Sequence, residues 1–140
     1  MIFAASICQA GWTKLSPSAY YNYTYCSISF ANEQVGYLTG YGTVKKTTDG
    51  GKNWTPVFHA DGYTFLHKIF VLNPDTLWAN GEGLVIRSFD GGATWDSLAV
   101  DTSKYRITLT IQFSADGHGT AFSYDGIYES ADFGNTWEKL

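Results

Sequence analysis

The chain has 140 residues, with 15 glycines, 17% aromatic residues and a formal net charge of −4. Its nine Lys and Arg residues are scattered along the sequence, which excludes a basic stripe for binding nucleic acid or an anionic membrane surface. High glycine and aromatic contents favour short strands with tight turns over a helical bundle, and no segment shows a sustained apolar period of 3.6 residues.

The first ten residues are apolar and end in small side chains before Gly11. This pattern is typical of the end of a secretory signal peptide whose basic start is missing, with cleavage after Ala10. An ordinary N-terminal strand is the alternative. The run is about half the ~20 residues that a membrane-spanning helix requires. We therefore expect a secreted or periplasmic bacterial protein, with residues 1–10 as a signal-peptide remnant and no membrane insertion.

The first repeat unit covers residues 27–57. Ile28 and Phe30 lie two positions apart, as apolar residues on one face of a strand do. A short turn rich in turn-forming residues follows, and then a second strand over Gly36–Thr39. Another such turn precedes a third strand that contains Val44. The spacing therefore predicts three consecutive antiparallel strands.

The same order recurs in residues 66–98 and 109–140, which align with the first unit without a gap. The aligned first strands contain Ile69 with Val71 and Ile111 with Phe113, the second strands cover Leu77–Asn80 and Gly119–Phe122, and the third strands contain Val85 and Ile127. Just before the first unit, Cys26 lies close to the apolar Ile28 and is expected to be a small buried residue.

Each third strand runs into an eight-residue box that reads hydroxyl, any residue, Asp, any residue, Gly, two variable residues, Trp. The Asp can accept backbone N–H bonds, the Gly supplies a positive φ, and the hydroxyl ties the strand end to the turn. The tryptophan packs into the adjoining seam and begins a fourth strand. These roles are structural rather than catalytic. The defining residues are Thr47, Asp49, Gly51 and Trp54, then Ser88, Asp90, Gly92 and Trp95, then Ser130, Asp132, Gly134 and Trp137.

The tryptophans recur at a nearly constant distance. The steps from Trp12 to Trp54, Trp95 and Trp137 are 42, 41 and 42 residues, so residues 12–15 are predicted to be a fourth strand without its own first three. A constant period indicates an array of identical supersecondary units. Four antiparallel strands per unit are typical of β-propeller blades, because one such sheet cannot bury both faces alone. The predicted fold class is all-β, with three four-stranded antiparallel blades.

The boxes resemble Asp-box repeats, also called bacterial neuraminidase repeats, over residues 12–140. Such repeats occur in sialidases, sortilin-type receptors, xyloglucanases and secreted proteins similar to photosystem II assembly factors. The copy Thr47–Trp54 is most similar to the last group. The resemblance implies a ring of usually about six to eight blades. Residues 11–140 are therefore expected to be a segment of a longer propeller, or one of two chains that complete a ring. The box does not decide the activity, because enzymes and non-enzymes share it.

Antiparallel connections divide the turns between two rims. The boxes and the turns after each first strand lie on one rim, whereas the turns after each second strand and the links between units lie on the other. Most tyrosines fall on this second rim, which we call the tyrosine rim. Tyrosine suits protein recognition and sugar stacking, although these rings alternatively cap strand ends and cover seams. The predicted ligand-binding residues are Tyr20, Tyr21, Tyr23, Tyr41, Tyr63, Glu82, Tyr105, Arg106 and Tyr124.

No catalytic residues are predicted in this chain. The resemblance to sialidases implies three arginines that clamp the substrate carboxylate, whereas the chain has only Arg87, beside the second box, and Arg106. Hydrolysis by a carboxylate pair requires two acids roughly 5–10 Å apart, and the candidates Glu82 and Asp125 belong to turns one blade apart. No metal or cofactor site is predicted either, because metal-ligand spacing is absent among His59, His67 and His118.

These observations favour a non-catalytic, secreted propeller scaffold for protein or glycan recognition or assembly. The alternative is a fragment of an Asp-box glycoside hydrolase, sialidase- or xyloglucanase-like, whose catalytic residues lie outside this chain. The expected partners are a protein or glycan ligand, and the remaining blades of a longer chain or a second copy.

Overall fold

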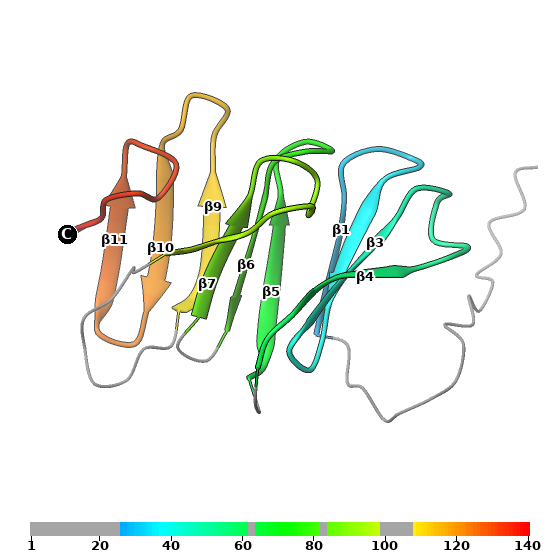
Figure 1. Ribbon diagram of the computed structural model, residues 1–140. Helices are drawn as coiled ribbons and strands as arrows, with labels where there is room; N and C mark the ends of the chain where they lie inside the picture. Colours follow the sequence, from blue (N-terminus) through cyan, green and yellow to red (C-terminus); the bar gives the residue numbers. More distant parts are fainter. Residues whose placement is uncertain (1–25, 62–63, 82–83, 99–107) are drawn as a thin grey trace, which may run out of the picture.

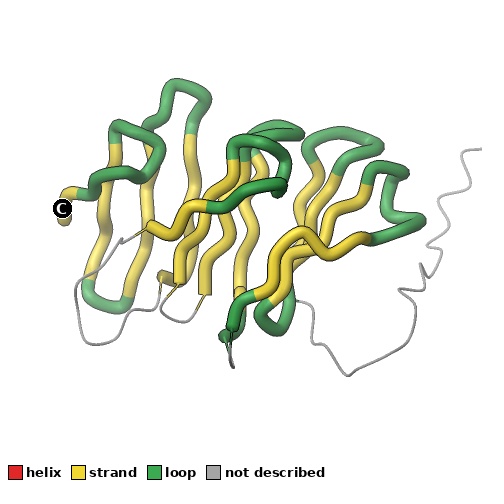
Figure 2. The backbone as a smooth tube through the Cα atoms, in the orientation of Figure 1, coloured by secondary structure: helices red, strands yellow, loops and turns green. Residues whose placement is uncertain are grey.

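The computed structural model describes residues 26–61, 64–81, 84–98 and 108–140. These residues form twelve strands and no helix, and the strands build three four-stranded antiparallel sheets (Figure 2). The predicted all-β fold class with three propeller blades is confirmed. Within the described residues there is accordingly no helix long and apolar enough to cross a membrane. The predicted signal-peptide remnant and the predicted strand over residues 12–15 lie outside this part of the chain.

The three sheets, which we call blades 1, 2 and 3, lie side by side in chain order (Figure 1). In each blade the strands pair in the order in which the chain makes them. Blade 1 consists of β1 (Ser27–Phe30), β2 (Gly36–Thr39), β3 (Thr43–Thr47) and β4 (Thr55–His59). Blade 2 consists of β5 (Leu66–Val71), β6 (Leu77–Gly81), β7 (Leu84–Ser88) and β8 (Asp96–Leu98). Blade 3 consists of β9 (Thr108–Phe113), β10 (Gly119–Ser123), β11 (Gly126–Ser130) and β12 (Glu138–Lys139).

The fourth strands begin one residue later than the sequence predicted. β4, β8 and β12 start immediately after the tryptophan of each box rather than at it. The indole Nε1 of Trp54, Trp95 and Trp137 donates to the carbonyl of the box glycine at 3.0, 3.1 and 3.0 Å. Because this bond holds the tryptophan in the turn, pairing with the third strand starts only at the next residue.

The core lies in the two seams between adjacent blades. Trp78 of blade 2 is fully buried in the second seam and stacks on Phe113 of blade 3, with ring centroids 4.2 Å apart. Because each cluster takes residues from two blades, a single blade could not shield its faces from water. The first seam buries Tyr37, Val44, Leu66, Ile69, Leu77, Ala79 and Ile86, and the second buries Trp78, Val85, Ile111, Phe113, Ala121 and Tyr128.

The outer face of blade 1 carries exposed apolar residues. Ile28 is 59% exposed, whereas the aligned residues Ile69 and Ile111 of the later blades are 7% and 2% exposed. Cys26, next to the same strand, is exposed, so the prediction that it is buried is wrong. The reason is that no blade within the described residues covers this face of β1.

Replacement of Trp78 by Ala should destabilise the protein by about 3–5 kcal/mol, because it removes the largest buried side chain of the second seam. Chemical denaturation followed by circular dichroism measures this loss. The control is Tyr124→Ala, since that side chain is 69% exposed and its loss should change stability by about 0.5 kcal/mol or less. Equal losses in the two variants would contradict a core at the seams.

Candidate functional site

The three boxes hold the same hydrogen-bond network. The hydroxyl of Thr47, Ser88 or Ser130 donates to the Asp Oδ1 at 2.8, 2.8 and 2.9 Å, and it accepts the N–H of the box glycine at 2.9, 2.8 and 2.9 Å. The same Oδ1 accepts the backbone N–H of the seventh box residue, and Oδ2 accepts its side chain. Both oxygens of each carboxylate are thus engaged inside the turn, which gives the Asp a structural role.

Hydrogen bonding also holds the pKa of the box carboxylates low. The pKa of Asp49 and that of Asp90 fall from 3.8 to about 2, and the pKa of Asp132 is lowered as well. The largest cause in each box is the seventh residue, through its backbone N–H and its side chain, and the first-position hydroxyl adds to the effect. These carboxylates are therefore charged at neutral pH and are unsuited to act as general acids.

The fourth and fifth box positions have positive φ angles, which favour glycine. In the third box Phe133 takes the fourth position with a φ of 58°, a conformation that costs a residue with a side chain about 1–2 kcal/mol. Its ring lies parallel to Trp78 at 6.4 Å and edge-on to Phe89 at 5.9 Å. These ring contacts offset the backbone strain.

The backbone carbonyl at the fourth position of the second box joins blade 2 to blade 1. Gly91 O accepts a hydrogen bond from Lys46 Nζ at 2.9 Å. The Tyr37 hydroxyl lies 2.6 Å from Pro74 O and 3.2 Å from Gly91 O, so its one proton can reach either carbonyl of blade 2. Burial, followed by the charges of two nearby carboxylates, raises the pKa of Tyr37 to about 12, which keeps the phenol a donor.

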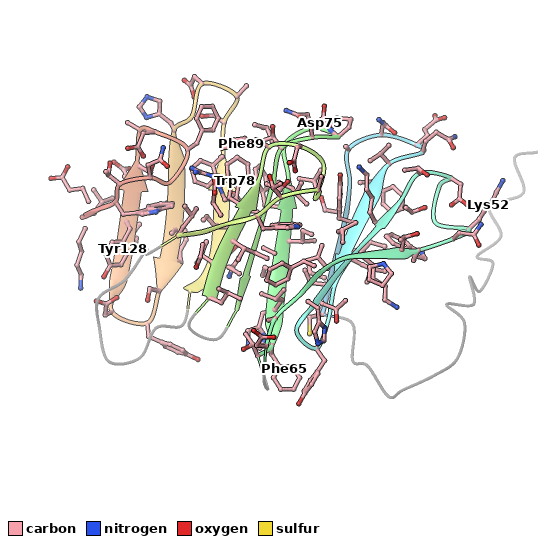
Figure 3. All side chains as sticks on the ribbon, viewed as in Figure 1. Lys52, Phe65, Asp75, Trp78, Phe89 and Tyr128 are labelled. Atoms are coloured by element: carbon pink, nitrogen blue, oxygen red, sulfur yellow. The ribbon has the colours of Figure 1, made fainter. Side chains whose placement is uncertain are left out.

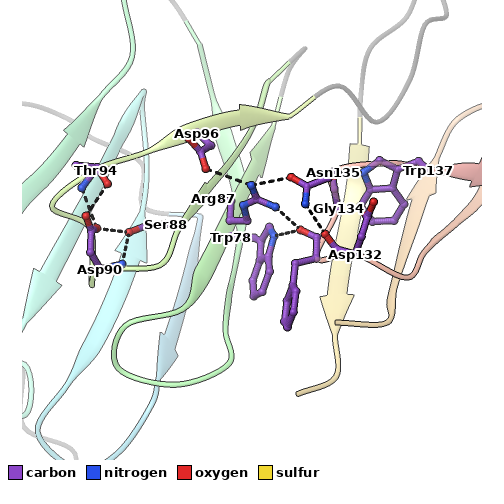
Figure 4. Close-up of polar contacts among 11 residues, drawn as sticks. Trp78, Arg87, Ser88, Asp90, Thr94, Asp96, Asp132, Gly134, Asn135 and Trp137 are labelled. Carbon is purple, nitrogen blue, oxygen red and sulfur yellow. Dashed lines mark hydrogen bonds and ion pairs between the residues drawn. The ribbon is translucent and has the colours of Figure 1, made fainter. Parts of the chain in front are cut away.

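The same carbonyl of the third box joins blade 3 to blade 2 (Figure 4). Phe133 O accepts from Arg87 Nη1 at 2.8 Å and from Trp78 Nε1 at 3.4 Å. Arg87 Nη2 also donates to Asp96 Oδ2 at 3.1 Å and to Asn135 Oδ1 at 3.0 Å. We call each arrangement a blade lock. It consists of the backbone carbonyl at the fourth position of one box and two side chains of the preceding blade. These side chains are the aromatic donor in the second strand of that blade and the cation immediately before its box.

The blade lock between blades 2 and 3 gives Arg87 a structural role. The side chain is 7% exposed and is engaged by three partners. A substrate carboxylate would therefore have to displace these partners to reach the guanidinium. Sequence reasoning missed the locks, although Lys46 and Arg87 each stand immediately before a box hydroxyl and so share one position of the repeat.

On the tyrosine rim the structure describes Tyr41 and Tyr124. Tyr41 is half-buried and lies opposite Phe65 in an isolated β-bridge, with the two rings edge-to-face at 4.7 Å. Phe65 in turn stacks on His67 at 6.2 Å, and Figure 3 shows it at this rim. Tyr124, in the turn between β10 and β11, is 69% exposed. Sequence reasoning missed Phe65, which immediately precedes β5 and carries no motif of its own.

The other predicted ligand-binding residues lie outside the described residues. One of them is Glu82, so the distance between Glu82 and Asp125, the candidate carboxylate pair, is not described. The Asp125 carboxylate accepts from Lys139 Nζ at 2.9 Å and from the Tyr128 hydroxyl at 2.8 Å, and these contacts lower its pKa, Lys139 most. In the part of the chain that the structure describes, no three His, Cys, Asp or Glu side chains gather to hold a metal. The residues outside are Tyr20, Tyr21, Tyr23, Tyr63, Glu82, Tyr105 and Arg106.

Comparison with known families assigns the repeat. A family model described as photosynthesis system II assembly factor YCF48 matches residues 6–140. The chain belongs to this family. The resemblance to Asp-box proteins of the assembly-factor type is thus confirmed. No curated protein matches the sequence.

Solved structures of the YCF48 family and of GH74 enzymes are similar to this chain. A structure of YCF48 bound to D1 peptide is 24% identical, with a TM-score of 0.73 over 84% of this chain and 40% of that one. YCF48 from Cyanidioschyzon merolae is 23% identical, with a TM-score of 0.70 over 84% and 37%. An ancestral GH74 enzyme is 16% identical, with a TM-score of 0.68 over 83% and 18%. The chain thus spans well under half of each of these proteins.

Acidification should destabilise the protein between about pH 4 and pH 2. A carboxylate whose pKa is lower in the folded state contributes stability above its unfolded pKa and loses it as the pH falls through its folded pKa. For Asp49 and Asp90 this window runs from 3.8 to about 2. Melting temperatures measured across this range should fall for the native chain and fall less steeply for Asp90→Asn. A native melting temperature that rises on acidification would contradict the role of the boxes.

Replacement of Arg87 by Met should cost about 2–4 kcal/mol, because Phe133 O and Asn135 Oδ1 lose a buried cationic donor. The matched variant Lys46→Met removes a half-buried lysine with one bond to the equivalent carbonyl, so its cost should be smaller. Urea denaturation compares the two. A loss below about 1 kcal/mol for Arg87→Met would show that the lock does not stabilise the seam.

Proposed function

We propose that this chain is part of a secreted, non-catalytic scaffold that binds a protein segment along the tyrosine rim. The observation that carries the proposal is the presentation of Tyr41 with Phe65, and of Tyr124, on the rim opposite the boxes. Membership of the YCF48 family supports an assembly role, and a related protein has been solved with a peptide bound. The predicted signal-peptide remnant supports a location outside the cytoplasm.

The Tyr41–Phe65 pair has the properties of an aromatic anchor. The two residues come from adjacent blades, and the bridge between their backbones fixes the rings relative to both sheets. A ring that is already held in place loses little conformational freedom when a ligand packs on it. The hydroxyl and the apolar ring of Tyr41 suit a peptide, which offers backbone groups as well as apolar side chains. The pair therefore offers a rigid surface across the first seam.

The structural contacts of the box carboxylates and of Asp125 support a non-catalytic role for these acids. The box carboxylates are saturated by their own turns, and Asp125 is held by Lys139 and Tyr128. A retaining or inverting hydrolase needs two acids facing each other across the substrate. The rival hypothesis places such a pair in other blades of a glycoside hydrolase, and the likeness to GH74 enzymes, at 16% and 19% identity, concerns the fold alone.

Binding of a fluorescent D1 peptide by the 140-residue chain tests the proposal. Tyr124→Ala should weaken binding by about tenfold or more, the effect of losing one buried aromatic contact of about 1.4 kcal/mol. Its melting temperature should stay within a few degrees, because the side chain is exposed. Phe89→Ala, which removes a half-exposed ring of the second box on the opposite rim, is the control and should bind normally, with circular dichroism to check that it is folded.

Two results would overturn the proposal. One is peptide binding that is absent or unaffected by Tyr124→Ala and by Tyr41→Ala. The other is release of reducing sugar from xyloglucan by the chain, which would assign it to the hydrolase class.

A further inference from the structure

We propose that the corner between the Tyr41 and Phe65 rings, together with the carboxylate of Asp61, binds a cationic side chain of the peptide ligand and prefers arginine. This inference rests on the function proposed above and deepens it, because it names the chemistry of the residue that the tyrosine rim takes up. The site lies at the first seam, between two blades that the structure describes, so it does not depend on what adjoins their other faces.

The two rings form a right-angled corner. Their planes meet at 89° with centroids 4.7 Å apart, and both residues are half-buried, so each remains partly accessible. A ring face attracts a cation, because the π-system carries negative charge on its faces. The planar guanidinium of an arginine can lie flat on one ring while its alkyl stem packs against the other. A corner of this kind therefore suits arginine better than the compact ammonium of lysine.

Backbone contacts hold Asp61 beside this corner. The N–H of Ala60 donates to Gly42 O at 2.7 Å. Asp61 directly follows Ala60, and Tyr41 directly precedes Gly42. The isolated β-bridge pairs Tyr41 with Phe65 in turn. The carboxylate and both rings are thus attached to the same short turn of blade 1.

The two ends of the link between blades 1 and 2 meet at Gly42. A methyl group at this glycine would lie 3.5 Å from Ala60 O and 3.3 Å from Thr64 O. Asp61 follows the first of these residues, and Phe65 follows the second. The carboxylate therefore belongs to a tight link that begins and ends next to the aromatic pair.

The carboxylate of Asp61 is available to a ligand. The residue is exposed, and among the described residues its side chain has no hydrogen-bond or ion-pair partner. The negative net charge of the chain, −4, also favours the approach of a cationic ligand. An unpaired acid next to partly accessible rings offers a cation both an opposite charge and a π-face.

Blade 3 shows the same combination with a cation in place. Lys139 Nζ lies 2.9 Å from Asp125 Oδ2 and 5.7 Å from the centroid of the Tyr128 ring. Asp125 lies in the turn between β10 and β11, which corresponds in the repeat to the turn that carries Tyr41. At this rim, blade 3 thus completes an aromatic ring and a carboxylate with its own lysine, whereas at blade 1 we assign the cation to the ligand.

Arg87 shows that a guanidinium also fits between a ring and a carboxylate in this fold. Its Cζ lies 4.6 Å from the centroid of the Phe89 ring, and its Nη2 lies 3.1 Å from Asp96 Oδ2. The guanidinium there contacts a single ring. The corner at the first seam offers two, which strengthens the expected preference for arginine.

Chemical-shift titration of the isotope-labelled 140-residue chain by NMR tests the inference. The probes are the peptide Gly-Ser-Leu-Arg-Leu-Ser-Gly and versions with lysine, citrulline or glutamate in place of the arginine. Citrulline keeps the shape of arginine without its charge. The arginine peptide should shift the amide signals of Tyr41, Asp61 and Phe65. It should bind about fivefold more tightly than the citrulline peptide, the effect of one exposed cation–π contact with one exposed ion pair.

Variants separate the carboxylate from the rings. Asp61→Asn should weaken binding of the arginine peptide about threefold and leave the citrulline peptide unchanged, whereas Asp61→Lys should favour the glutamate peptide. Glu33→Gln, which removes an equal charge from an exposed residue on the box rim, is the control and should have no effect. Tyr41→Leu should lose most of the preference for arginine, and Tyr41→Phe, which keeps the ring, should retain it. Circular dichroism checks that each variant is folded.

The outcomes distinguish this inference from the function on which it rests. Equal binding of the arginine and citrulline peptides, or a preference that survives both Asp61→Asn and Tyr41→Leu, would overturn the inference alone. So would shifts confined to residues away from the first seam, or binding of the D1 peptide without binding of any of these probes. If neither the D1 peptide nor any probe binds, the proposed function fails as well.

Discussion

The backbone carbonyl at the fourth position of each box connects the turn of one blade to the sheet of the blade before it. In the second and third boxes this carbonyl is satisfied by side chains of the neighbouring blade, not by the strand ladder. A carbonyl left unpaired at a buried seam would be costly. The turn, the seam and the neighbouring sheet are therefore stable only together, and the strained Phe133 is tolerated because its carbonyl and its ring both serve the second seam.

The polar side chains of the boxes are already engaged in hydrogen bonds on their own rim. Their hydroxyls and carboxylates bond to one another and to the turn backbone, and the cations next to them hold the locks. Groups that are engaged in this way fix a turn and are poorly placed to bind a substrate. The surface that we propose for recognition is the opposite rim, where Tyr41 and Phe65 join two blades and Tyr124 extends into solvent. A rigid stack that presents loops at one end is a common way to build a binding surface.

The chain is similar in fold to both YCF48 proteins and GH74 enzymes, so the blade architecture by itself does not determine an activity. The features that these proteins share with the chain are the requirements of stacking four-stranded sheets. A function is added through the residues of one rim, and it has to be argued from those residues. In this chain the described rim carries the aromatic residues Tyr41, Phe65 and Tyr124, and its Asp125 is tied to Lys139.

The sequence by itself determined the strand order, the three boxes and the propeller class. Those features follow from alternation along a strand and from hydrogen bonds that span at most four residues, such as Ser88 to Gly92. The locks, the exposure of Cys26 and the later start of the fourth strands were decided only by the tertiary structure. They depend on neighbours far away in the chain or on the detailed turn geometry: Arg87 meets Phe133 across 46 positions. Local patterns specify which face of a strand is apolar, whereas the blade packed against that face decides which polar groups are buried there and need a partner.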